Sequence, residues 1–152
     1  MNDFDFLVGT WSVANRRLTK RLVGSDDWEE FPGESTAVKV WDGAANFDQI
    51  DFPTKGWRGL TLRLYDPARE EWSLYWSNSR DGLLGLPPVV GRFAEDGTGS
   101  FYADEEQEGQ QVRVRYLWSG ITDTTARWEQ AFSPDGERTW ETNWIMDMTR
   151  TA

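Results

Sequence analysis

The stretch FLVGTWSV, Phe6 to Val13, decides how the fold begins. Trp11 and Val13 alternate with polar neighbours, and this period of two predicts a strand with one face toward a core. Gly9 interrupts the apolar residues just before the first tryptophan. Only the preceding NDFDF and the residues after Asp42 could be helical, and both segments are short. The chain is therefore expected to start with a half-buried strand.

The same alternation recurs between closely spaced turn signals along the rest of the chain. It covers residues 60–64, 72–76, 112–118, 128–132 and 140–148. Leu60, Leu62 and Leu64 are expected on the inner face of their strand, and so is Thr142 in the last strand. Without a long helix to cover it, such a sheet must close on itself or double into a sandwich. We predict an all-β fold, a single antiparallel β-barrel of about eight to ten strands spanning residues 1–152.

Composition excludes several classes of function. The net charge is −10, from 26 acidic and 16 basic residues without a basic patch, so a nucleic acid is not expected as a partner. The absence of cysteine and histidine removes thiolate and imidazole chemistry, and no cofactor or metal is implied. Neither a signal peptide nor a long apolar run is visible, which predicts a cytoplasmic protein without membrane insertion.

The start of the first strand resembles the Gly-X-Trp motif of the calycin superfamily, which includes the lipocalins. The motif is Gly9-Thr10-Trp11, and MTR at the end of the chain supplies Arg150. The resemblance implies a short N-terminal helical plug, with Gly9, Trp11 and Arg150 closing one end of the barrel. Nearly the whole chain resembles a bacterial family of lipocalin-like domains of unknown function. Haem-binding relatives use an axial histidine, which this chain lacks.

Polar residues that share the inner parity of the strands are candidates for contacting a ligand. Several such groups among aromatic side chains are typical of a small-molecule site. The candidate polar contacts are Arg17, Asn78, Tyr116 and Gln130, and the candidate walls are Trp76, Trp128 and Trp144. We expect the barrel to bind a small apolar or amphipathic molecule. The alternative is a structural or interaction module whose ten tryptophans fill the interior.

Three further features have competing interpretations. An enzyme could use Glu129, Glu141 and Asp147, but these acids are expected on the wet face, where no pocket excludes water. GLLGLPPVVG, residues 82–91, could be a lid, a homodimer contact or an ordinary loop. SPDGERTW, residues 133–140, resembles the Asp-box hairpin of sialidases; we interpret it as a turn held by Asp135.

Overall fold

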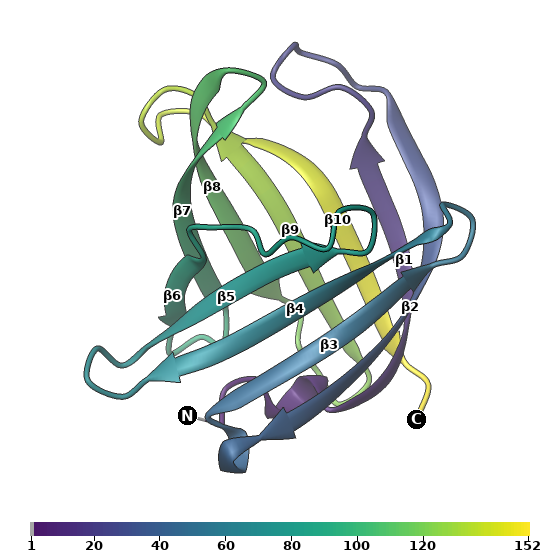
Figure 1. Ribbon diagram of the computed structural model, residues 1–152, viewed down its shortest axis with the longest axis vertical. Coiled ribbons are helices and arrows are strands. Elements are labelled where there is room, and N and C mark those ends of the chain that lie inside the picture. The colour runs from purple at the N-terminus through teal and green to yellow at the C-terminus, as the bar shows by residue number, and fades with distance from the viewer. Residues whose placement is uncertain (1) are drawn as a thin grey trace.

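The computed structural model describes residues 2–152 as a closed barrel of antiparallel strands (Figure 1). Two short 3₁₀ turns, η1 (Asp5–Leu7) and η2 (Trp41–Gly43), complete the secondary structure of these residues. The strands are β1 (Gly9–Leu18), β2 (Trp28–Val40), β3 (Ala45–Phe52), β4 (Trp57–Asp66), β5 (Glu71–Asn78), β6 (Val89–Phe93), β7 (Gly99–Gln107), β8 (Gln110–Ser119), β9 (Thr125–Ser133) and β10 (Glu141–Arg150). The predicted all-β barrel is confirmed, with ten strands.

The barrel closes because β1 pairs with both β2 and β10. Trp11 lies opposite Ser35 on β2 and opposite Arg150 on β10. Every other pair joins strands that follow one another in the chain. An antiparallel barrel built in this way leaves no long edge for pairing with another chain.

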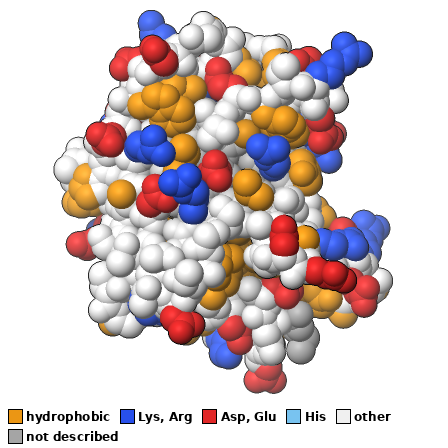
Figure 2. Space-filling view, turned by 180° about the vertical axis from the view of Figure 1, so that it is seen from behind, with side chains coloured by type: hydrophobic (Ala, Val, Ile, Leu, Met, Phe, Trp, Pro, Cys, Tyr) orange, Lys and Arg blue, Asp and Glu red, His pale blue; other side chains and the backbone are white. Residues whose placement is uncertain are grey.

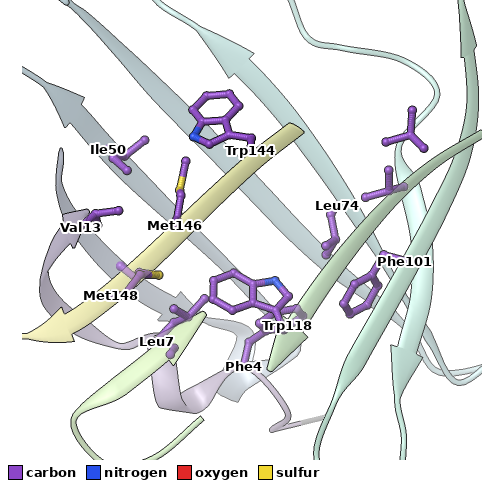
Figure 3. Close-up of a cluster of buried hydrophobic side chains, with 14 of the residues drawn as sticks. Phe4, Leu7, Val13, Ile50, Leu74, Phe101, Trp118, Trp144, Met146 and Met148 are labelled. Carbon is purple, nitrogen blue, oxygen red and sulfur yellow. The ribbon is translucent and has the colours of Figure 1, made fainter. Parts of the chain in front are cut away.

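The η1 turn lies beneath one end of the barrel (Figure 1) and buries two apolar side chains there. Phe4 is 1% exposed and packs edge-on against Trp72, with their ring centroids 5.0 Å apart. Figure 3 shows Phe4 and Leu7 beside Trp118 at this end of the core, and Trp144 farther along the barrel. We call the end that η1 covers the floor of the barrel and the opposite end its mouth.

Trp11 and Arg150 meet at the floor. The Arg150 guanidinium lies over the Trp11 ring, 4.4 Å from its centroid, and donates to the carbonyls of Val8 (2.7 Å), Asp123 (2.9 Å) and Phe6. The Trp11 indole donates to the Leu7 carbonyl at 2.9 Å. The side chains of the first and last strands thus hold the turn between η1 and β1.

Gly9 makes this close approach possible. Its φ is +125°, a conformation that residues with a side chain rarely adopt. A Cβ at this position would also lie 2.7 Å from Nη1 of Arg150. Both the backbone and the available space therefore require glycine at the start of β1.

The expected orientation of β4 is wrong. Leu60 is 44% exposed, whereas Arg63 is 4% exposed and points inward. The inner face of β4 is the one that carries Trp57 and Gly59, both of which are buried. Arg63 lies on this face because β3 provides buried partners for it, described below, and the leucines cover the outside of the barrel.

The last strand also departs from simple alternation. A β-bulge between Thr142 and Trp144 shifts the register of β10 against β9. As a result Asn143, expected on the outer face, is fully buried, and Thr142 is only half-buried. A bulge adds a residue that a period-two pattern does not anticipate.

The barrel wall has one short seam. β6 pairs with β5 only over Trp72–Leu74, so the second half of β5 has no strand beside it on that side. The segment 79–88 covers this stretch instead. The Gly85 N–H donates to the Trp76 carbonyl at 2.7 Å, and the Ser77 hydroxyl donates to the Leu83 carbonyl at 2.8 Å.

Candidate functional site

The interior of the barrel contains a cavity of about 80 Å³, which we call the central cavity. A water molecule occupies about 30 Å³ of liquid, so this space is a few waters in size. Pockets for drug-sized ligands have volumes of roughly 300–1,000 Å³. The lining residues are Ser35, Asp48, Ile50, Thr61, Arg63, Leu74, Trp76, Tyr116, Trp118, Trp128, Gln130, Trp144, Met146 and Met148.

Three indoles form one wall of the central cavity. The Trp144 ring lies edge-on to both Trp128 and Trp76, with centroid distances of 5.7 Å and 6.2 Å. The indole N–H of Trp144 donates to Oδ1 of Asn15 at 3.0 Å, and both side chains are buried. This hydrogen bond fixes the Trp144 ring between the cavity and the mouth.

The lining of the central cavity also contains a buried ion pair. Nη2 of Arg63 lies 2.5 Å from Oδ2 of Asp48, and Nη1 donates to Oδ1 of Asn46 at 2.8 Å. The Arg63 guanidinium also lies over the Phe4 ring, 5.1 Å from its centroid. Nε of Arg63 is buried without a hydrogen-bond partner.

Tyr116 and Gln130 lie side by side on paired strands, opposite one another in the register of β8 and β9. Gln130 donates to Oδ1 of Asn143 at 2.8 Å, so its amide is positioned by the bulge residue. Burial raises the pKa of Tyr116, and the negative charge of Glu105 adds to this effect. Burial likewise raises the pKa of Glu105. The phenol therefore stays neutral and can donate a hydrogen bond at physiological pH.

A second cavity, of about 100 Å³, lies behind segment 79–88. We call it the seam cavity. It shares Leu74, Trp76 and Tyr116 with the central cavity, and Glu105 is also among its lining residues. Leu74, Trp76 and Tyr116 therefore lie between the two cavities. The Trp76 ring lies against Gly59, where an added Cβ would collide with the indole.

The structure brings five of the seven predicted ligand contacts together. Trp76, Tyr116, Trp128, Gln130 and Trp144 all line the central cavity. Arg17 lies over Trp144, 4.5 Å from the ring centroid, on the side toward the mouth. Asn78 instead accepts hydrogen bonds from the Arg80 backbone (3.0 Å) and side chain (3.4 Å), and so holds a turn.

Sequence reasoning missed Asp48, Arg63 and Asn46. The alternation of β3 contained a usable signal, because Asn46 and Asp48 share the parity of Ile50 and Phe52. Once β3 is paired with β4, Asp48 lies opposite Thr61 and Asn46 opposite Arg63. Because the leucines of β4 were expected to face inward, Arg63 was expected on the outer face of the strand.

Two of the three acids considered for catalysis, Glu141 and Asp147, form polar contacts with other residues. Asp147 forms a two-point ion pair with Arg127, with N···O distances of 2.7 Å and 3.1 Å. Glu141 accepts a hydrogen bond from the Leu22 backbone at 2.7 Å. Among the described residues, no three acidic side chains are grouped to hold a metal ion.

The remaining predictions concern the outside of the molecule. Figure 2 shows acidic and basic side chains interspersed on one face. Leu83 and Leu86 are about 70% exposed, and a homodimer contact through residues 82–91 stays a prediction. Within residues 2–152, no helix is long and apolar enough to cross a bilayer.

The fold is similar to that of a solved structure, the S-type phycobiliprotein lyase CPES from Guillardia theta. The TM-score is 0.63, and the match covers 98% of this chain and 90% of that chain. The two sequences are 10% identical, so the likeness concerns the fold alone. Comparison with models of known protein families finds no match, and neither does comparison with the sequences of curated proteins.

Proposed function

We propose that the protein is a calycin-type barrel that binds a small, partly apolar molecule in its interior. One observation carries the proposal. Two cavities, one central and one at the seam, are separated by the side chains of Leu74, Trp76 and Tyr116, and indoles line the central one together with the polar groups of Arg63, Tyr116 and Gln130. An aromatic enclosure with a few convergent polar groups is the usual form of a small-molecule site.

The size of the central cavity defines how binding would occur. At about 80 Å³ it is too small for most organic ligands. Rotation of the Trp76 indole away from Gly59 would join the two cavities and free the volume of the ring itself. Because Trp76 is only half-buried and borders the covered seam, it is the wall residue best placed to move. Binding therefore requires a minor conformation of this side chain.

The fold is compatible with this function. The lyase that shares it is named for its action on phycobiliproteins, and at 10% identity that activity is not transferred to this chain. The alternative is an interior that is simply filled by side chains and binds nothing. The dimensions of the central cavity favour that alternative unless Trp76 moves.

A neutral fluorescent probe tests the proposal. N-phenyl-1-naphthylamine should bind the wild-type protein saturably, with one site per chain, measured by its fluorescence increase. Trp76→Ala should bind it about tenfold more tightly or better, because the fraction of protein that is competent to bind no longer depends on moving the indole. Trp140→Ala is the matched control, since Trp140 lies outside against Arg115. A wild-type protein that shows no saturable binding contradicts the proposal and supports the filled interior.

A further inference from the structure

Three arginines gather at the mouth of the barrel: Arg17 at the end of β1, Arg21 in the β1–β2 connection and Arg80 in the β5–β6 connection. We call them the mouth arginines. Within residues 2–152, no carboxylate lies within 4.0 Å of their charged nitrogens. In a chain of net charge −10, unpaired cations at one place need a physical reason.

Two of these cations lie at the ends of a continuous aromatic strip. Arg17 covers the Trp144 ring at 4.5 Å, and Arg80 covers the Trp57 ring at 3.9 Å. Phe52 lies between the two indoles, 6.0 Å from Trp144 and 4.6 Å from Trp57. All three rings are buried, so the strip is a packed cluster that lies beneath the two guanidinium groups.

The arginines also have unused hydrogen-bond donors. Nε of Arg17 and Nε of Arg21 are buried and have no partner. A buried donor without a partner is unfavourable, and in native proteins most such groups are satisfied by protein, water or a ligand. An anion that reached these nitrogens would supply the missing acceptors.

The charges around the mouth arginines also bear on whether an anion would bind there. The pKa of Arg17 is lowered to about 10, first by burial and then by the positive charge of Arg21, with Arg80 adding to it and Glu29 opposing it. Glu29 is already paired with Lys55 at 2.5 Å. Glu141 and Glu108 also face Arg21. Arg17, whose neighbours Arg21 and Arg80 are both positive, is therefore the arginine where a bound anion is most favoured, whereas Glu108, Glu141 and Glu29 already balance part of the charge of Arg21.

We propose that the mouth arginines bind the anionic group of an amphipathic organic ligand whose apolar part packs on Trp144, which lines the central cavity. The inference rests on the proposed function, because the apolar part is expected to continue into the barrel. A groove of about 350 Å³ between the β1–β2 connection and the β7–β8 hairpin gives an anionic group access to Arg21; Arg17 and Arg80 are not among its lining residues. The acidic residues around it disfavour polyanions, so a single carboxylate, sulfonate or phosphate is the expected group.

A matched pair of probes tests this inference. 1-Anilinonaphthalene-8-sulfonate has the same ring skeleton as N-phenyl-1-naphthylamine and adds one sulfonate. The wild-type protein should bind the sulfonate about tenfold or more tightly than the neutral probe, since charge-assisted hydrogen bonds contribute at least that factor. The preference should fall as salt is added, because the sulfonate's attraction to partly exposed cations is screened.

The double variant Arg17→Gln/Arg80→Gln should abolish the preference for the sulfonate. Arg58→Gln/Arg69→Gln is the control, because it also removes two positive charges but from exposed ion pairs, Arg58 with Asp51 and Arg69 with Asp66 and Glu71. The ratio of the two affinities is the readout, so a general loss of packing, which affects both probes, does not imitate the expected result.

Each other outcome has a definite meaning. Equal binding of both probes to the wild-type protein, or a preference that survives in the double variant, overturns the inference and leaves the proposed function standing. Binding of neither probe overturns both. A preference lost equally in Arg58→Gln/Arg69→Gln would show an effect of overall charge and would also overturn the inference.

Discussion

Asp135, in the motif SPDGERTW, uses its side chain to hold a turn of the backbone. Its carboxylate accepts hydrogen bonds from the Thr139 N–H at 2.9 Å and from the Thr139 and Ser133 hydroxyls. Trp140 then lies outside the barrel, with its ring 4.4 Å from the Arg115 guanidinium. The segment SPDGERTW therefore forms the turn between β9 and β10, as its sequence predicts.

These hydrogen bonds lower the pKa of Asp135 to about 2, chiefly through the Thr139 hydroxyl and N–H. A carboxyl whose pKa is lower in the folded state stabilises the fold above its ordinary pKa of 3.8 and loses this contribution as the pH falls toward 2. Asp135→Ala should therefore lower the melting temperature at pH 7. We expect the difference from wild type to shrink between pH 4 and pH 2. A difference that is independent of pH in thermal melts would contradict this assignment.

At the scale of elements, strands whose apolar residues face inward were predictable, and those with an inward charge were not. The inner faces of β8 and β9 follow the alternation of Val114, Tyr116, Trp128 and Gln130. β4 does not, because the partner of Arg63 lies on another strand. The period-two alternation of a strand identifies which residues share a face. It does not say which of the two faces is inside the barrel when the inner face carries a buried ion pair.

The Asp48–Arg63 pair tests this interpretation. Arg63→Met should destabilise the protein by about 3–5 kcal/mol, because it leaves the Asp48 carboxylate buried without its partner. Asp48→Leu together with Arg63→Met should be less destabilising than the sum of the two single changes, since neither charge then remains. The measurement is urea unfolding of all four proteins. Additive effects would mean that the two side chains are independent.

At the scale of the whole molecule, the sequence was sufficient for the barrel and only partly sufficient for the site. Strand alternation and the Gly9, Trp11 and Arg150 pattern predicted a closed barrel with a short N-terminal turn. The lining by Trp76 and Trp144 followed from parity. The seam cavity could not be predicted from the sequence. It depends on where β6 stops pairing with β5, and the local sequence pattern does not contain this register.

The seam should also be the least stable part of the wall. Amide hydrogen exchange, measured residue by residue, is expected to show lower opening free energies for β6 and the second half of β5 than for β1 and β10, which pair along most of their length. Uniform protection across all ten strands would show that the covering segment 79–88 is as firmly held as a strand.

Because β6 pairs with β5 over only a few residues, one side of the barrel wall is held by fewer strand contacts than the rest. Because η1, Trp11 and Arg150 close one end, we expect local opening mainly at the β5–β6 seam and at the mouth. Anything that enters would leave by the same two routes. The residence time of a bound molecule would then depend first on how often the β5–β6 seam opens. The contacts inside the barrel would have a smaller effect.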